Sequence, residues 1–243
     1  MTLFRSCLFF VCFYLVTSIL CIIYIPFLLL PRKYFAPLAR IWVTIVVWVV
    51  GITSGISYEL RGQNNRPDSP VIYACKHQSA WETFAFNLIV FDCAYVMKKE
   101  LLRLPLFGWY LTRMGNISVD RSAGSKALRD MVTQAQAVLD AKRDIVIFPQ
   151  GTRTLTGDTT SPYLPGVAGL YSKANVSVVP VALNSGMFWP RGKFTKYKGT
   201  VTIEFLEPIP AGLSRKEFIT RLKNAVEPAT ERLEAEAKER FFS

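Results

Sequence analysis

The 243-residue sequence predicts an α/β fold with a mixed, mainly parallel sheet and flanking helices, preceded by an N-terminal hydrophobic two-helix membrane element. Two long uncharged runs occupy the first 57 residues, and short apolar runs alternate with helical periods from about Glu59 onward. Disorder is excluded because 51% of the residues are hydrophobic and only 19% are charged. We therefore expect a membrane-embedded two-helix segment, residues 1–57, and an α/β domain, residues 58–243.

The two uncharged runs cover residues 7–30 and 41–56. A helix needs about 20 apolar residues, at a rise of about 1.5 Å each, to cross the hydrocarbon core of a bilayer. The first run is long enough and the second is marginal. Neither is typical of a secretory signal, whose apolar region has roughly 7–15 residues. Both runs are therefore predicted to be helices that contact a membrane, with buried core helices as the alternative.

Two arrangements in the membrane remain open. Residues 1–57 contain four basic residues and no acidic one, and Arg32, Lys33 and Arg40 lie in the connection between the runs. If both runs span, the positive-inside rule places this connection in the cytoplasm and the rest of the chain outside. A hairpin embedded in one leaflet avoids that conflict, because its ends and its basic elbow lie at the same headgroup surface.

The domain is predicted to contain five strands separated by helices. The strands are short runs rich in Val, Ile and Phe, at residues 71–75, 94–97, 145–148, 176–183 and 201–205. The clearest helix covers residues 125–142, where apolar residues recur at helical spacing. The charge-rich segment 214–240 predicts a solvated helix that is interrupted at Pro228. Strands that alternate with helices favour a mainly parallel sheet with helices packed on it.

The net charge of +11 indicates an anionic partner or an anionic surface. Part of the charge lies in a basic and aromatic segment, residues 188–198, which contains Phe188, Trp189, Arg191, Lys193, Phe194, Lys196, Tyr197 and Lys198. Such a mixture can stack nucleic-acid bases, meet lipid phosphates at a headgroup interface, or form a solvated loop. The membrane runs in the same chain favour the lipid surface, so we expect a membrane lipid surface and no nucleic acid as partner.

His77 is the sole histidine of the chain, which excludes sites that need two or more imidazoles, such as a three-histidine zinc centre. It follows the strand predicted at 71–75, and Glu82 lies five residues further on. On a continuous helix the two side chains would point about 140° apart. They therefore meet only if His77 lies in the turn and Glu82 in the first helical turn. Such a pair can act as a general base and its orienting carboxylate; the alternative is a histidine merely satisfied at a strand end.

Three further motifs follow His77 along the chain. They are residues 99–109 leading to Val119-Asp120-Arg121, then Phe148-Pro149-Gln150-Gly151-Thr152-Arg153, and last Val179-Pro180-Val181-Ala182-Leu183. In this order and spacing, the four blocks resemble those of the glycerolipid acyltransferases, specifically the bacterial 1-acylglycerol-3-phosphate acyltransferases. Two positions depart from the family pattern: Glu82 stands where the first block normally has Asp, and Gln150 where the third normally has Glu.

The resemblance implies a glycerolipid acyltransferase fold in which His77 is the general base and Glu82 its partner. It also implies binding of the acceptor's phosphate by Arg121, Gly151, Thr152 and Arg153, with Lys99 as a weaker candidate. The chemistry of these residues agrees, because a guanidinium offers a planar fork to a phosphate and a glycine lets backbone N–H groups approach an anion closely. A surface ion pair between Arg121 and Asp120 or another acid is the alternative for Arg121.

The resemblance further implies the reaction. A fatty acyl group would pass from an acyl thioester, of CoA or of acyl-carrier protein, to the sn-2 hydroxyl of 1-acylglycerol-3-phosphate (lysophosphatidate), giving phosphatidic acid in phospholipid biosynthesis. No metal is expected, and no cofactor besides the donor substrate. The implied location is the bacterial inner (cytoplasmic) membrane, with the catalytic domain on the cytoplasmic side. Two alternatives are another lysolipid acceptor, such as a lyso-aminolipid, and a non-catalytic membrane-bound protein that binds anionic lipids.

Overall fold

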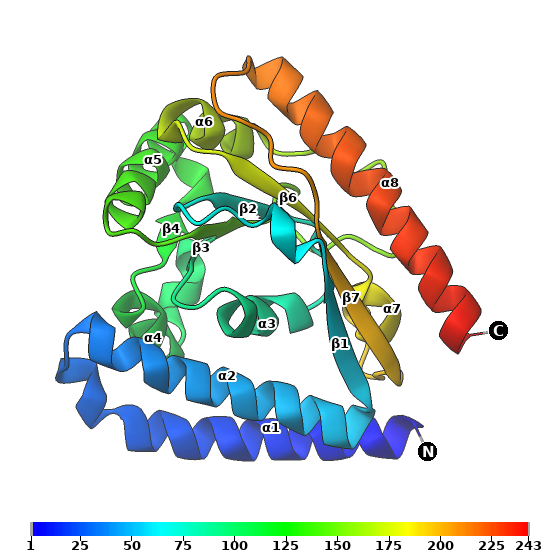
Figure 1. Ribbon diagram of the computed structural model, residues 1–243. Helices are drawn as coiled ribbons and strands as arrows, with labels where there is room; N and C mark the ends of the chain where they lie inside the picture. The colour runs from blue at the N-terminus through cyan, green and yellow to red at the C-terminus, as the bar shows by residue number, and fades with distance from the viewer. Residues whose placement is uncertain (1, 243) are drawn as a thin grey trace.

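The computed structural model describes residues 2–242, which form a seven-stranded sheet with helices on both faces and a helical hairpin along one side (Figure 1). The strands are β1 Ile56–Arg61, β2 Ile72–Cys75, β3 Ala94–Lys98, β4 Ile117–Val119, β5 Ile145–Ile147, β6 Val178–Leu183 and β7 Gly199–Phe205. Their order in the sheet is β1-β7-β6-β2-β5-β3-β4, and each neighbouring pair is parallel except β6 with β7. The predicted α/β class with a mixed, mainly parallel sheet is confirmed.

Helices connect the strands and cover the sheet. The α-helices are α1 Thr2–Tyr24, α2 Arg32–Ser54, α3 Trp81–Ile89, α4 Phe107–Arg113, α5 Ser125–Asp140, α6 Pro165–Ala174, α7 Ser185–Phe188 and α8 Arg215–Phe241. Short 3-10 helices are η1 Pro26–Leu29, η2 Gln63–Asn65, η3 Lys99–Arg103 and η4 Arg121–Ala123. Helices α5, α6 and α8 share a buried cluster with one face of the sheet, and α2 and α3 share one with the other.

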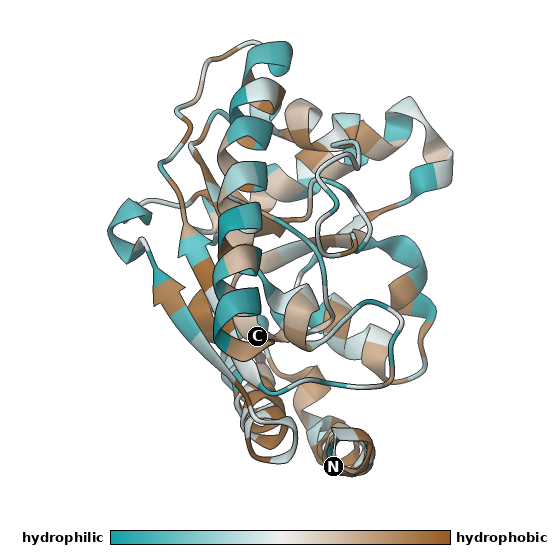
Figure 2. Cartoon of the chain, turned by 90° about the vertical axis from the view of Figure 1, so that its right-hand side faces the viewer, coloured by the Kyte–Doolittle hydropathy of each residue, from teal (hydrophilic) through white to brown (hydrophobic). Residues whose placement is uncertain are grey.

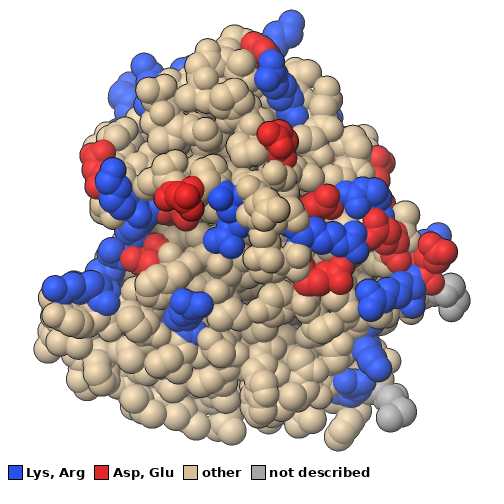
Figure 3. All heavy atoms as spheres, in the orientation of Figure 1, with Lys and Arg blue, Asp and Glu red and all other residues tan. Residues whose placement is uncertain are grey.

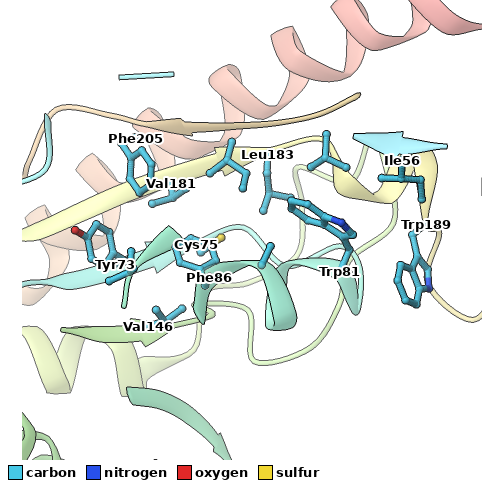
Figure 4. Packing of buried hydrophobic residues seen from close by; sticks show 14 of the residues in the cluster. Ile56, Tyr73, Cys75, Trp81, Phe86, Val146, Val181, Leu183, Trp189 and Phe205 are labelled. Carbon is cyan, nitrogen blue, oxygen red and sulfur yellow. The ribbon is translucent and has the colours of Figure 1, made fainter. Parts of the chain in front are cut away.

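Strand β2 lies at the centre of the sheet and contributes to both clusters. Its side chains alternate, as the pleat of a strand requires: Tyr73 and Cys75 pack toward α2 and α3, whereas Ile72 and Ala74 pack toward α5, α6 and α8. Figure 4 shows the first of these clusters, in which Trp81 at the start of α3 lies among strand side chains. The residues that follow β2 are therefore held at the middle of the molecule.

The five predicted strands are all present, and the sequence missed two more. Strand β4 has only three residues, and β1 is an edge strand in which polar and apolar residues are equal in number. Neither gives the apolar run on which strand prediction depends. Strand β1 begins at Ile56, so it crosses the boundary expected between residues 57 and 58.

The predicted interruption at Pro228 is wrong, because α8 continues through this residue to Phe241. Proline removes the hydrogen bond to the carbonyl four residues earlier, which belongs to Asn224. Both Pro228 and Asn224 are exposed, so water can satisfy the freed carbonyl. The helix is also only partly solvated, since Phe218, Leu222, Val226, Leu233 and Ala237 are buried against the domain.

Helices α1 and α2 form the hairpin, and each is long and apolar enough to cross a membrane by length and composition. They run side by side in opposite directions along the lower side of the molecule in Figure 1. Figure 2 shows both in mainly hydrophobic colours, and Figure 3 shows few charged residues over this side of the face in view. Helix α1 leaves a stripe of large apolar side chains exposed, at Phe4, Leu8, Val11, Leu15, Ile19 and Ile22.

Helix α2 packs along the domain rather than projecting from it. Near its start, Phe35 stacks on Tyr110 of α4 with ring centroids 5.7 Å apart. Further along, Trp42 lies edge-on to Phe84 of α3 at 5.5 Å, and Val50 near its end belongs to the core shared with α3. The domain therefore contacts the hairpin over almost the whole length of α2.

Candidate active site

His77 lies in the turn between β2 and α3, where three contacts fix its position. Its ring stacks on Phe148, with centroids 4.0 Å apart and an interplanar angle of 19°. Its carbonyl oxygen accepts hydrogen bonds from the backbone N–H of Thr154 at 2.7 Å and from the Thr154 hydroxyl at 3.1 Å. The preceding residue, Lys76, donates its N–H to Val181 on β6, so the turn starts from a paired strand end.

Glu82 lies in the first turn of α3, fully buried, with Oε1 2.8 Å from Nδ1 of His77. The same Oε1 accepts the backbone N–H groups of Gln78 and Ser79, each at 2.7 Å, and Oε2 accepts the hydroxyl of Ser185 at 2.8 Å. Because the other partners all donate, the group is a carboxylate, and the N-terminus of a helix favours its charge. The Nδ1 of His77 then carries the proton, and Nε2 keeps a lone pair.

His77 lies in the turn and Glu82 in the first helical turn, which is the arrangement that their spacing in the sequence requires for contact. Trp81, anchored in the core beside Glu82, sets where that helical turn begins (Figure 4). The glutamate side chain, one methylene longer than aspartate, reaches the imidazole from this position. In the described part of the chain, no protein group forms a hydrogen bond with Nε2 of His77. This nitrogen is therefore available to accept a proton from a bound substrate.

A second turn, formed by residues 149–154, contacts His77 through Thr154. Gly151 adopts a φ of +63°, and a Cβ there would come within 2.4 Å of Leu164 and 2.8 Å of Arg121. Its N–H donates to the carbonyl of Phe148 at 2.8 Å, which closes the turn. Gly151 thus serves turn shape and the close approach of Arg121, rather than offering its own N–H to an anion.

Arginine side chains gather around this second turn. Arg121 donates to the carbonyl of Gly151 at 2.6 Å, and Arg191 donates to the carbonyl of Arg153. Arg121 and Arg191 are exposed and Arg153 is partly exposed, so their unused N–H groups can reach an anionic ligand. Thr152 is exposed at the same turn. Three guanidinium groups near one turn, which contacts His77 through Thr154, suit a phosphate.

The remaining predicted residue, Lys99, is less closely connected. Its exposed ammonium lies 3.5 Å from the carboxylate of Asp120, which precedes Arg121, and it makes no contact with the turn itself. Gln150 is buried and points to Glu227 on α8, with Nε2 3.5 Å from Oε1, rather than to the arginines. Across residues 2–242, no group of three or more His, Cys, Asp and Glu side chains is arranged to hold a metal ion.

Sequence reasoning did not single out Ser185, and it placed Arg191 only in the basic and aromatic segment. Ser185 reaches Glu82 across 103 positions of sequence, and Arg191 reaches Arg153 across 38. Neither stands in a recognisable local pattern with the residue that it contacts. One member of that segment, Lys196, is not at the surface as expected: it is 1% exposed, enclosed by Phe10, Trp189 and Phe194.

Comparison with known proteins gives three kinds of likeness. A protein-family model described as Acyltransferase matches residues 57–184. A 1-acyl-sn-glycerol-3-phosphate acyltransferase of Pseudomonas aeruginosa is 36% identical over 67% of this chain and 63% of its own length. The protein of the same description from Saccharomyces cerevisiae is 27% identical over 66% of this chain and 54% of its own length. The chain thus aligns with less than two thirds of the length of these two relatives.

A lyso-ornithine lipid O-acyltransferase of Pseudomonas aeruginosa is 25% identical over 74% of this chain and 75% of its own length. Among solved structures, the 1-acyl-sn-glycerophosphate (LPA) acyltransferase PlsC of Thermotoga maritima matches with a TM-score of 0.73 and 22% identity. That match covers 99% of both chains. This structural likeness extends over the hairpin as well as the domain, and it shows the fold.

Proposed function

This chain belongs to the Acyltransferase family, and we propose that it transfers a fatty acyl group from an acyl thioester to the sn-2 hydroxyl of 1-acylglycerol-3-phosphate, giving phosphatidic acid. The observation that carries the proposal is the 2.8 Å contact between His77 Nδ1 and the buried Glu82 carboxylate. It provides an oriented imidazole with a free Nε2, which is what a general base for a hydroxyl nucleophile requires. The relatives of matching description support the choice of acceptor.

In the proposed reaction, Nε2 of His77 takes the proton of the acceptor hydroxyl as its oxygen attacks the thioester carbonyl. Glu82 stabilises the imidazolium that forms and keeps the ring in place. The tetrahedral intermediate then expels the thiolate, which receives the proton from the imidazolium. An ester bond forms, a thioester bond breaks, and His77 returns to its starting state without a covalent acyl-enzyme.

The acceptor's phosphate is assigned to the turn beside His77. Arg121, Gly151, Thr152 and Arg153 form this site in the proposal, and Arg191 joins them because its guanidinium contacts the same turn. Lys99 is assigned a peripheral role, because its ammonium pairs with Asp120, the residue that precedes Arg121. A phosphate held here would leave its glycerol hydroxyl within reach of the histidine turn, since Thr154 connects the two turns.

The hairpin is proposed to lie in one leaflet of the membrane, with residues 1–57 as the embedded segment. The packing of α2 along the domain supports this arrangement, because a spanning α2 would draw the polar domain into the bilayer with it. The basic and aromatic segment contacts α1, where Phe194 stacks on Phe10 at 4.8 Å. A lipid acceptor could therefore pass from the leaflet to the turn at residues 149–154, around which the arginines gather. We assign the domain to the cytoplasmic side of a bacterial inner membrane, where acyl-CoA and acyl-carrier protein are found.

A second acceptor class is favoured by one observation. The relative described as a lyso-ornithine lipid O-acyltransferase aligns with three quarters of its own length. A lyso-ornithine lipid carries no phosphate, so it should depend less on the arginines than lysophosphatidate does. The two acceptors can thus be separated by the dependence of activity on Arg153.

The test is an acyl-transfer assay of the purified protein with a panel of lysolipids and with both CoA and acyl-carrier-protein thioesters. We expect lysophosphatidate to give the highest kcat/KM and phosphatidic acid to be the product. A preference for a lyso-aminolipid would replace the acceptor assignment. Absence of transfer to every lysolipid, in the presence of correctly folded protein, would overturn the proposed function.

A further inference from the structure

Helix α8 lies outside the residues matched by the family model, yet two of its carboxylates reach the turn that carries His77. Glu227 and Glu234 are seven residues apart, so they lie on the same face of the helix. Glu227 binds the side chain of Lys76, and Glu234 binds that of Gln78. These are the two residues on either side of His77.

The contact with Lys76 is buried. Its Nζ lies 2.5 Å from Oε2 of Glu227, with the two side chains 1% and 7% exposed, and it also donates to the carbonyl of Asp158 at 2.8 Å. The other oxygen of Glu227 accepts the hydroxyl of Tyr163 at 2.8 Å. Burial beside Glu227 raises the pKa of Tyr163, so this hydroxyl remains a donor. A buried ammonium needs an anionic partner, and Glu227 is the carboxylate that contacts it.

The contact with Gln78 holds the other side of the turn. Nε2 of Gln78 donates to Oε1 of Glu234 at 2.5 Å, and Oε1 of Gln78 accepts the N–H of Gly186 at 3.2 Å. The second oxygen of Glu234 accepts the N–H of Gly157 at 2.7 Å. Both ends of the Gln78 amide are thus fixed, one by α8 and one by α7.

We propose that α8 is the positioning element of the catalytic turn, with Glu227 and Glu234 fixing the residues on both sides of His77. Glu234 also binds the N–H of Gly157 directly, and Glu227 acts on Asp158 through Lys76. The two carboxylates therefore fix the loop that follows residues 149–154 relative to His77. The inference rests on the proposed acyl transfer and adds the residues that align its base.

The same cluster gives a reason for Gln150, where the family pattern has Glu. The amide of Gln150 lies 3.5 Å from the carboxylate of Glu227. A glutamate at 150 would place a second carboxylate at that distance, and two carboxylates sharing a buried site disfavour each other's charge. In this chain one buried lysine is therefore balanced by one carboxylate, and α8 supplies it.

The proposal predicts a charge-exchange pattern. In Glu227→Gln the Lys76 ammonium loses the carboxylate that contacts it, and in Gln150→Glu that carboxylate gains a like-charged neighbour. Each change displaces the turn, and a misplacement of about 1 Å can cost about 100-fold in rate. We expect kcat to fall about 10- to 100-fold in each, with a smaller change in KM. The double variant Gln150→Glu/Glu227→Gln restores one carboxylate, and we expect its kcat to exceed that of both single variants and to approach the wild-type value.

The matched control is Glu231→Gln, which removes an exposed carboxylate from the same helix and should keep the wild-type kcat. The full-length proteins are assayed in detergent micelles with lysophosphatidate and an acyl thioester, below the Tm of each variant. A folded Glu227→Gln with wild-type kcat, or a double variant no better than the single ones, would overturn the proposal. If Glu227→Gln does not fold, Glu234→Gln takes its place, and a folded Glu234→Gln with the wild-type kcat would overturn the proposal.

A second measurement does not depend on acyl transfer. The chain has one histidine, so ¹⁵N-histidine labelling with a histidine-free affinity tag reports on His77 alone. We expect the imidazole ¹⁵N shifts to change in Glu227→Gln and to return in the double variant, while Glu231→Gln leaves them unchanged. Identical spectra for wild type and Glu227→Gln would overturn the positioning role. An inactive wild type that still shows the expected shifts would overturn only the proposed function.

Discussion

At the scale of single residues, the carboxylate of Glu82 connects three parts of the molecule. It accepts hydrogen bonds from two backbone N–H groups of the turn, the His77 imidazole, and the Ser185 hydroxyl at the start of α7. With 0% exposure, it has no water to replace a lost partner. The same side chain therefore shapes the turn and sets the tautomer of the base.

Replacement of Glu82 tests this double role. In Glu82→Gln an amide faces four donors and can accept through one oxygen only, so we expect kcat to fall by at least about 100-fold. Glu82→Asp keeps the charge but is shorter by one methylene, and it should retain more activity than the glutamine variant. The measurement is kcat for acyl transfer at equal amounts of folded protein. Equal activity of the two variants would contradict the role of the charge.

Arg153 tests the phosphate assignment. A hydrogen bond to a charged group contributes about 1.5–3 kcal/mol, so Arg153→Ala should raise KM for lysophosphatidate about 10- to 100-fold. KM for the thioester donor should change little. An unchanged KM for the phosphorylated acceptor would remove Arg153 from the site, and a loss of kcat alone would point to a role near the base.

At the scale of elements, the buried Lys196 joins α1 to the domain. Its Nζ lies 4.5 Å from the ring centroid of Phe10 on α1 and 4.9 Å from that of Trp189, and it donates to the carbonyl of Phe194 at 2.6 Å. Its backbone N–H donates to the hydroxyl of Ser6 on the same helix at 2.9 Å. In residues 2–242 no carboxylate forms an ion pair with Lys196, and burial lowers its pKa to about 8 from 10.5.

This lowered pKa predicts how stability depends on pH. Between about 8 and 10.5 the unfolded chain binds the Lys196 proton and the folded chain does not, so the free energy of unfolding contributed by this group rises with pH across that window. Lys196→Met removes the contribution and should raise Tm below pH 8 by a few degrees. Thermal unfolding of both proteins from pH 7 to 10.5, with Lys193→Met as the exposed control, measures the difference. A constant difference across the window would contradict the prediction.

Contacts between residues close in sequence could be predicted, whereas contacts made by the distant helix α8 could not. His77 and Glu82 are five residues apart, so local spacing was enough to pair them, and the five strands with apolar runs were found for the same reason. Glu227 and Glu234 contact Lys76 and Gln78 across 151 and 156 positions. On a helix as charge-rich as α8, nothing local marks these two carboxylates. Only the packing of α8 on β6 brings them to the turn.

At the scale of the whole molecule, the apolar hairpin and the charged domain form one body. Helix α2 contacts the domain from Phe35 to Val50, and α1 turns its apolar stripe outward. A leaflet surface can cover that stripe while the domain stays in water. The net charge of +11 suits such a surface, because anionic headgroups attract basic side chains.

The one-leaflet arrangement predicts a labelling pattern. A cysteine at the exposed Pro37, near the start of α2, and one at Lys126 on the domain should react with a membrane-impermeant thiol reagent from the same side, in a background without the native cysteines. Inside-out vesicles and intact spheroplasts provide the two sides. Labelling of the two positions from opposite sides would contradict the arrangement and support two spanning helices.

His77 is proposed to be the general base of an acyl transfer to lysophosphatidate. Its most direct test is the rate of phosphatidic acid formation by the purified wild-type protein and by His77→Ala, at equal amounts of folded protein. Removal of a positioned general base typically costs on the order of 10² to 10⁴ in rate, and we expect a loss in this range with Tm little changed. Phosphatidic acid formed by His77→Ala at the wild-type rate would rule out His77 as the general base.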